Sequence, residues 1–289
     1  MKKSMSLYFI FWILVFSFIL FFTVNIFLLS DIISENSYQY DLEKHGVSII
    51  PSVFTDSETD KLKKLCDNGQ FKETKEFLIQ HTGLQNKCFK KTGENYIFQD
   101  YIWIIQKSVV HTCHRDNNGD FFNKGQKYPS YTVLVYLEPM EKSLGVIPKS
   151  HLEKGSFNFN ITDPIIHLTC NPGDVIIFNA NLIHVGAMNK KDHHLRCQMK
   201  VSHREDIPVL GYYQNFNKVL NQENTLPGFI RHIQKRGSCA LPMISDLTQS
   251  ENIRTARGSD NGINIGIFQK TFSYLFYGNK DFYDLPNAF

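Results

Sequence analysis

Two histidines and one aspartate, carried by two short segments, have the residue types and spacing of a metal site. His114 and Asp116 are separated by one residue, and His184 follows a Pro-Gly-Asp turn and the apolar run Val175 to Phe178. Residues two positions apart on an extended strand point to the same side, so His114 and Asp116 can hold one ion. Two histidines and one carboxylate are the ligand set of non-haem iron(II) oxygenases. The sequence therefore predicts an iron site at His114, Asp116 and His184.

In addition to the three predicted metal ligands, a basic side chain is expected that binds the carboxylate of a co-substrate. A 2-oxoglutarate co-substrate chelates iron through its 2-oxo acid end, which leaves its distal carboxylate in need of a partner. Arg196 follows His184 on the strand-like segment Leu195 to Val201. An arginine can bind a carboxylate with two parallel hydrogen bonds, whereas a lysine acts as a point charge. We therefore expect Arg196 to bind the co-substrate, with Arg204 as the competing candidate further along the chain.

Other assignments of these residues stay open. A His-x-Asp pair on a strand also occurs as a structural hydrogen-bonded pair, and short motifs give many false matches. His111 is a substitute ligand, because His111-x-x-His114 brings two imidazoles near each other, although positions three apart on a strand face opposite sides. His151 is expected to make a structural hydrogen bond.

The elements expected around these residues are mostly strands. The capping-box residues Thr55 and Glu58 mark the start of a helix expected over 57–66, and a second helix is expected over 71–80. Short strands separated by Gly, Pro, Asn or Lys follow at 101–110, 131–137, 146–148, 165–168, 175–178 and 195–201. Many strands without alternating helices favour a sandwich or barrel, so the fold class is mainly β with flanking helices.

Five segments in order resemble the phytanoyl-CoA dioxygenase-like family of Fe(II)/2-oxoglutarate-dependent oxygenases. They are the stretch 40–54, which resembles the family's opening strand, the capping box, the His-x-Asp, the Gly145 to His151 segment, and the Gly-Asp-Val-Ile-Ile-Phe stretch with its histidine and arginine. Lys149 stands where that family usually has glycine. The resemblance covers residues 38–205, and residues 206–289 are expected to form a C-terminal extension that packs on the core with at least one helix. Within this extension, residues 237–241 and 249–262 are rich in Gly, Ser, Asn and charge and are expected to form loops.

The resemblance implies a double-stranded β-helix, of the jelly-roll or cupin-like kind, that uses iron(II), 2-oxoglutarate and O2, with ascorbate as an optional addition. It also implies a hydroxylated product, because the related halogenases lack the carboxylate that Asp116 supplies. The substrate stays open among small molecules, glycans and lipids. The alternative is a non-catalytic, membrane-anchored β-helix that serves as a binding or scaffold module.

The N-terminal residues predict a membrane anchor. Lys2 and Lys3 precede an uncharged apolar run over 7–29, and Asp31 and Glu35 follow it. A helix of that length spans on the order of 30 Å, which is enough for a bilayer core. With the positive charges on the cytosolic side, residues 1–30 are expected to form a cytosolic stub and signal anchor, and the catalytic domain is expected to be lumenal or extracellular.

Composition and cysteine usage add little about partners. The chain has 289 residues and a formal net charge of +3, which gives no indication of nucleic-acid binding. Its six cysteines lack a Cys-x-x-Cys pair, so a structural zinc site is not expected. Disulfides and buried free thiols both remain open, and the sequence selects no pairing.

Overall fold

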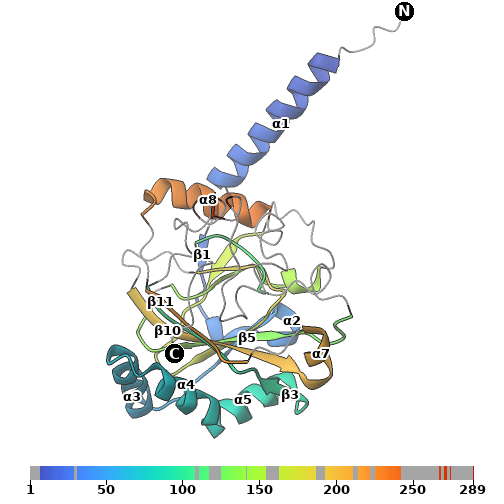
Figure 1. Ribbon diagram of the computed structural model, residues 1–289. Helices are drawn as coiled ribbons and strands as arrows, with labels where there is room; N and C mark the ends of the chain where they lie inside the picture. Colours follow the sequence, from blue (N-terminus) through green and yellow to red (C-terminus); the bar gives the residue numbers. More distant parts are fainter. Residues whose placement is uncertain are drawn as a thin grey trace, which may run out of the picture.

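The protein is mainly β, with helices packed around two sheets, as the computed structural model shows (Figure 1). The strands lie at the centre of the body, while α1 extends away from it. The structure describes residues 7–28, 31–107, 111–116, 125–140, 142–153, 163–186, 193–210, 214–221, 225–241, 267, 270–271, 274 and 289.

The strands form one small sheet and one large sheet. The four-stranded sheet has the order β1 (Asp31–Ile33), β7 (Ile165–His167), β6 (Gly145–Val146) and β9 (His184–Val185). The seven-stranded sheet contains β11 (Phe216–Asn221), β4 (Tyr101–Lys107), β10 (His193–His203), β5 (Tyr131–Tyr136), β8 (Val175–Asn179) and β2 (Val47–Ile50), with β3 (Tyr96–Phe98) also paired to β10. The pairs β1–β7 and β4–β11 are parallel, and the other pairs are antiparallel.

Three consecutive helices cover the outer face of the large sheet: α3 (Asp56–Asp67), α4 (Phe71–Gln80) and α5 (Thr82–Thr92) (Figure 1). The α3 helix begins at the expected capping box, in which the Thr55 side chain accepts from the Glu58 amide and Glu58 accepts from the Thr55 amide. Leu62 and Leu78 are completely buried against the sheet. This face therefore forms a closed apolar layer.

Alternating side chains of the large sheet serve two separate cores. Val133 and Val135 of β5 pack outward with the helices, whereas Leu134 and Tyr136 pack inward toward the small sheet. Successive residues of a strand point to opposite faces. Cys197 of β10 lies in the outer core, so Arg196, which precedes it, lies on the inner face.

Five short helical segments connect these elements. They are η1 (Ser37–Gln39), α2 (Leu42–His45), η2 (Ser150–Leu152), η3 (Arg204–Asp206) and α7 (Ile207–Leu210). Lys149, which precedes η2, adopts a left-handed backbone with φ 72°. Glycine adopts that conformation most easily, and glycine is the residue of the resembled family at this position.

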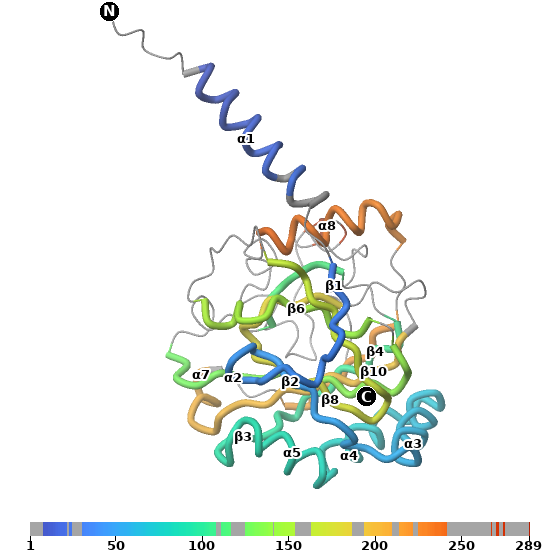
Figure 2. The backbone as a smooth tube through the Cα atoms, turned by 180° about the vertical axis from the view of Figure 1, so that it is seen from behind, coloured from blue at the N-terminus to red at the C-terminus, as the bar shows by residue number. Residues whose placement is uncertain are grey.

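The chain after β10 returns to both sheets. The β11 strand pairs with β4, and α8 (Gly228–Ala240) lies across the other end of the molecule, next to α1 (Figures 1 and 2). Cys239 of α8 forms a disulfide with Cys113, while Cys66, Cys88, Cys170 and Cys197 are buried free thiols. This settles the pairing that the sequence left open.

The strands expected from the sequence are present with small shifts of their ends, and so are the first two helices. Two expectations are wrong, and one helix was missed. Residues 40–54 are not one opening strand, because Asp41 caps the short α2 and only 47–50 pair with β8. Residues 237–241 are not a loop, because buried contacts of Cys239 and Ala240 keep α8 helical through Ala240 despite the local Gly and Ser. The α5 helix was not expected; the loop predicted at 249–262 lies outside the described residues.

The predicted membrane anchor is contradicted. The α1 helix runs from Leu7 to Leu28, and its side chains are described at 8–21, 23 and 24. Within the described part of the chain, no helix is long and apolar enough to cross a bilayer. The prediction of a single-pass protein anchored by 7–29 is therefore wrong, and the lumenal or extracellular placement, which followed from the anchor, loses its basis.

A buried ion cluster joins β1 to α8. Asp31 contacts the ammonium of Lys235, and its Oδ1 lies 3.0 Å from Nη2 of Arg236. Only 3% of each cation is exposed. His167 Nε2 lies 3.4 Å from Asp31 Oδ2. Burial opposes ionisation of Asp31, but His167 and the two cations outweigh that effect and lower its pKa.

Asp31→Asn should lower the free energy of unfolding by about 3 kcal/mol, because it leaves two buried cations without their counter-charge. Chemical denaturation at neutral pH measures this change. The exposed Asp60 on α3 supplies the control, since Asp60→Asn should change stability by less than about 0.5 kcal/mol. Equal effects of the two substitutions would contradict the role of the cluster.

The same contact has a pH dependence. Because the folded-state pKa of Asp31 is lowered, its stabilisation is present above the unfolded-state pKa of about 3.9 and is lost as the pH falls below it. Below about pH 4, the free energy of unfolding should therefore fall less steeply with decreasing pH in Asp31→Asn than in the wild type. Chemical denaturation at a series of pH values measures this difference.

Candidate metal centre

Backbone pairing brings the two predicted segments together. The His114 amide donates to the His184 carbonyl and the His184 amide donates to the His114 carbonyl, each at 3.0 Å. Two residues on, the Asp116 amide donates to the carbonyl of Ala180 at 2.9 Å. The His-x-Asp segment is thus an extended stretch with one isolated bridge, and it holds both of its polar side chains next to His184.

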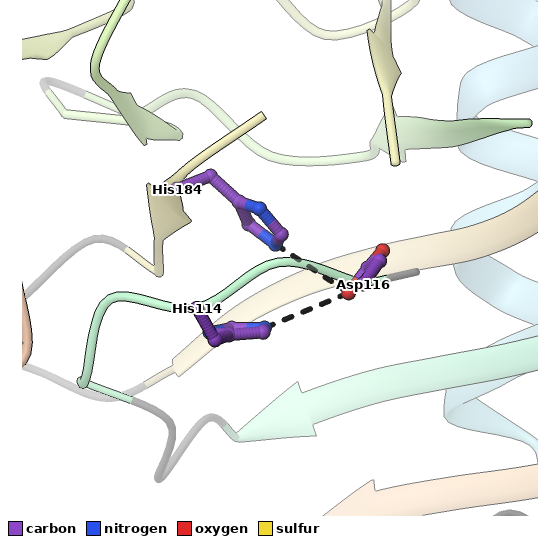
Figure 3. Close-up of side chains that lie close together, drawn as sticks. All are labelled: His114, Asp116 and His184. Carbon is purple, nitrogen blue, oxygen red and sulfur yellow. Dashed lines mark ion pairs between the residues drawn. The ribbon is translucent and has the colours of Figure 1, made fainter. Parts of the chain in front are cut away.

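The three side chains converge on one point (Figure 3). His114 Nε2 lies 3.6 Å from Asp116 Oδ1, and His184 Nε2 lies 3.5 Å from the same oxygen. One ligand atom from each residue lies within 4.8 Å of the other two, and within the described residues this is the group of His, Cys, Asp and Glu side chains that could hold a metal ion. The arrangement can accept a small divalent cation on one face.

Hydrogen bonds on the far side of each ring fix the imidazoles. His114 Nδ1 lies 2.9 Å from the carbonyl oxygen of Thr112, and His184 Nδ1 lies 3.0 Å from that of Leu182. A carbonyl can only accept, so each Nδ1 carries the hydrogen and each Nε2 presents a lone pair to the shared point. Burial and the adjacent His114 lower the pKa of His184, which favours this neutral form.

The second oxygen of Asp116 is held from the opposite side. Lys200 Nζ donates to Oδ2 at 2.6 Å, and the Thr132 hydroxyl donates to the same oxygen at 2.6 Å. Burial alone would raise the pKa of Asp116, but the charge of Lys200 holds it well below its usual range. Asp116 is therefore a fixed carboxylate with Oδ1 directed at the two imidazoles.

Cys113 and Arg115, which alternate with the two candidate ligands, point away from them. Cys113 is bonded to Cys239 of α8, and Arg115 is 1% exposed. Arg115 Nε donates to the Asn181 carbonyl at 3.0 Å, in the turn that leads to His184. Alternating side chains thus anchor the segment on one side and form the candidate site on the other.

Arg196 lies on the inner face of the large sheet, four residues before Lys200 on β10. It is opposite Tyr136 of β5, whereas Lys200 is opposite Thr132. At about 3.3 Å per residue the two positions are about 13 Å apart along the strand. Burial lowers the pKa of Arg196, and Nη1 donates to the His194 carbonyl at 3.2 Å. Arg204, the competing candidate, is exposed on η3, away from this face.

The structure brings His114, Asp116 and His184 together; their role as metal ligands stays a prediction. His111 does not join them, because its Nε2 contacts Gln234 of α8 at 2.6 Å. His151 Nε2 contacts the carbonyl of Glu43, which agrees with a structural role.

Sequence reasoning missed Lys200 and Thr132. The signal for Lys200 was present, since a lysine four positions from Arg196 on a buried strand must face the same side. The signal for Thr132 was only its place on a predicted strand, because the register of β5 against β10 brings it beside Lys200.

Comparisons with known proteins leave the family open. No family model matches the chain, and no curated protein matches it. Solved structures with a similar fold include EvdMO1, at TM-score 0.46 and 15% identity, which covers 56% of this chain and 48% of its own. The non-heme alpha-ketoglutarate-dependent epimerase SnoN of nogalamycin biosynthesis has TM-score 0.44 and 15% identity over 56% of this chain and 79% of its own.

HygX from Streptomyces hygroscopicus, solved with nickel and 2-oxoglutarate bound, has TM-score 0.41 and 14% identity over 56% of this chain and 84% of its own. The chain thus spans about half the length of EvdMO1 and more of the other two. At these scores the likeness assigns no function, and the resemblance to the phytanoyl-CoA dioxygenase-like family stays a prediction.

Arg115→Leu should destabilise the protein by about 2–3 kcal/mol, because it leaves the Asn181 carbonyl without its charged donor inside the protein. Arg115→Lys should recover only part of this loss, since lysine lacks the planar fork. Urea denaturation measures both variants. Arg204→Leu, on an exposed arginine, is the matched control and should stay within about 0.5 kcal/mol of the wild type.

Proposed function

We propose that the protein is an iron(II)- and 2-oxoglutarate-dependent dioxygenase that hydroxylates its substrate. His114, Asp116 and His184 would hold the iron, and Arg196 would bind the distal carboxylate of 2-oxoglutarate. The observation that carries the proposal is the convergence of two Nε2 atoms and one Asp116 oxygen on a single point.

The donor set fits iron(II). Two neutral imidazoles and one carboxylate bind this ion on one face and leave its remaining positions open for a chelating co-substrate and O2. Both imidazoles are already in the tautomer that a metal needs, and Asp116 offers one oxygen because the other is engaged by Lys200 and Thr132. Little rearrangement of the side chains is therefore required on metal binding.

The buried Arg196 supports the choice of 2-oxoglutarate as the co-substrate. The residue is 8% exposed, and no carboxylate of the described residues forms an ion pair with it. A buried guanidinium without a counter-charge is costly, and an incoming carboxylate would remove that cost. Arg196 also lies on the inner face of β10, which it shares with Lys200 beside Asp116.

The chain's own residues would bind the metal and 2-oxoglutarate and would orient them. When bound, iron(II) and 2-oxoglutarate supply the oxidising chemistry, in which O2 and 2-oxoglutarate are consumed, succinate and CO2 are formed, and a C–H bond is hydroxylated. Arg196 would fix the direction of 2-oxoglutarate by pairing with its distal end. The carbonyls of Thr112 and Leu182 would keep both imidazoles turned toward the metal.

The finer assignments belong to the same proposal. The two sheets would be those of a double-stranded β-helix over 38–205 of the phytanoyl-CoA dioxygenase-like kind, with 206–289 as an extension. Asp116 favours hydroxylation over halogenation, since a carboxylate fills the position that chloride would need. The substrate would be a small molecule, a glycan or a lipid, no nucleic acid is expected, and ascorbate would act as an auxiliary reductant.

The direct test is formation of succinate from 2-oxoglutarate by the purified full-length protein under air. Succinate should appear only when Fe(II) is added, and Asp116→Ala should abolish it at every 2-oxoglutarate concentration. Anaerobic calorimetry with Mn(II) and 2-oxoglutarate supplies a second measurement that does not depend on turnover. A folded wild-type protein that binds neither ligand would instead support the non-catalytic binding module.

Arg196→Ala should raise the 2-oxoglutarate concentration required while leaving Mn(II) binding nearly unchanged, because Arg196 contacts the co-substrate and not the metal. Loss of a charge-assisted, two-pronged contact should weaken 2-oxoglutarate binding roughly 30- to 1000-fold. Arg196→Lys should restore part of this loss. Calorimetric titration of 2-oxoglutarate into the Mn(II)-loaded variants gives these values.

Arg204→Ala controls for the loss of an arginine near the end of β10. Its 2-oxoglutarate affinity should equal that of the wild type, since Arg204 is exposed on η3. Unchanged affinity in Arg196→Ala would show that another residue binds the distal carboxylate.

A further inference from the structure

We propose that Lys200 is a positioning residue that serves as the counter-ion of Asp116 in the metal-free protein and weakens divalent-cation binding at the site. The inference rests on the proposed function, because it concerns the metal at His114, Asp116 and His184. It assigns a role to a side chain outside the ligand set.

The contact is close and shielded. Lys200 Nζ lies 2.6 Å from Asp116 Oδ2 and 2.8 Å from the Thr132 hydroxyl oxygen. The side chains of Lys200 and Asp116 are 14% and 11% exposed. In such surroundings a lone carboxylate is costly, so the ammonium supplies the charge that stabilises Asp116 when no metal is present.

The same ammonium opposes a metal. With neutral imidazoles, the three ligand residues carry one negative charge, and Lys200 cancels it. A divalent cation at Oδ1 would lie on the other side of the same carboxylate, within a few ångströms of Nζ. Like charges at that separation repel strongly in a partly buried site. Lys200 should therefore lower metal affinity even though it orients the carboxylate.

Thr132 acts on the same oxygen without charge. Its hydroxyl donates to Asp116 Oδ2 at 2.6 Å. Losing it removes a hydrogen bond that orients a ligand, and losses of this kind weaken metal binding about 10- to 100-fold. The two partners of Oδ2 should thus have opposite effects on metal affinity when each is removed, which a purely structural role of Lys200 would not produce.

The test measures Mn(II) affinity by anaerobic calorimetry without 2-oxoglutarate, in the full-length protein. Lys200→Met should bind Mn(II) at least about tenfold more tightly than the wild type, because the repulsion is gone. Lys200→Gln, which keeps a neutral donor for Oδ2 and so supports folding, should also bind more tightly. Thr132→Val should bind about tenfold more weakly. Lys200→Arg keeps the charge, so it should not bind Mn(II) more tightly than the wild type.

Lys75→Met is the matched control. The Lys75 side chain is 12% exposed and forms an ion pair with Asp100 on the outer side of the large sheet, away from the metal centre. This variant therefore removes an equally buried, paired ammonium, and its Mn(II) affinity should be unchanged. Thermal unfolding adds a second measurement, because Mn(II) should raise the melting temperature of Lys200→Met by more than that of the wild type.

Two results separate the inference from the function on which it rests. A wild-type protein that binds no Mn(II) overturns the proposed function. Mn(II) binding that Asp116→Ala abolishes, together with affinity in Lys200→Met and Lys200→Gln that is unchanged or weaker than wild type, overturns the role of Lys200 alone.

Discussion

The candidate centre depends on two backbone hydrogen bonds between His114 and His184. These bonds place two segments that are distant in the sequence at a fixed separation, so their side chains meet. The Asp116 amide extends the pairing to Ala180, and Arg115 binds the next carbonyl in that turn. Because each contact uses backbone groups or a buried guanidinium, the site is built into the framework that joins the two sheets.

Much of the candidate site could be predicted from the sequence, because the residue types that a metal site requires recur at the two-residue spacing of a strand. The His-x-Asp spacing, the run Val175 to Phe178 and the position of Arg196 each follow from residue type and the alternation of side chains. The spacing argument also placed Cys113 and Arg115 away from the site, and the structure has them there. Local rules suffice where a feature depends on neighbours in the sequence.

The features that the sequence did not reveal depend on pairing between distant segments. Thr132 and Lys200 meet at Asp116 only through the register of β5 against β10, and no local pattern contains that register. The disulfide required knowing that α8 returns to the His-x-Asp segment, and the helix itself ends in Gly, Ser, Cys and Ala, whose burial overrides weak local propensity. The length and flanking charges of the apolar N-terminal run predicted an anchor, but no helix in the described part of the chain is long and apolar enough to cross a bilayer.

Residues 113–116 show how the fold combines rigidity with an open site. Cys113 is covalently bonded to α8 and Arg115 binds the turn before His184, while His114 and Asp116 face the opposite side. The alternation of an extended chain lets Cys113 and Arg115 hold the segment from one side, while His114 and Asp116 offer two candidate metal ligands on the other. The two oxygens of Asp116 also have different roles. Lys200 and Thr132 donate to Oδ2, which leaves Oδ1 directed at the two imidazoles. Each of these contacts uses an atom other than the two Nε2 atoms and Asp116 Oδ1, so these three candidate ligand atoms remain unobstructed.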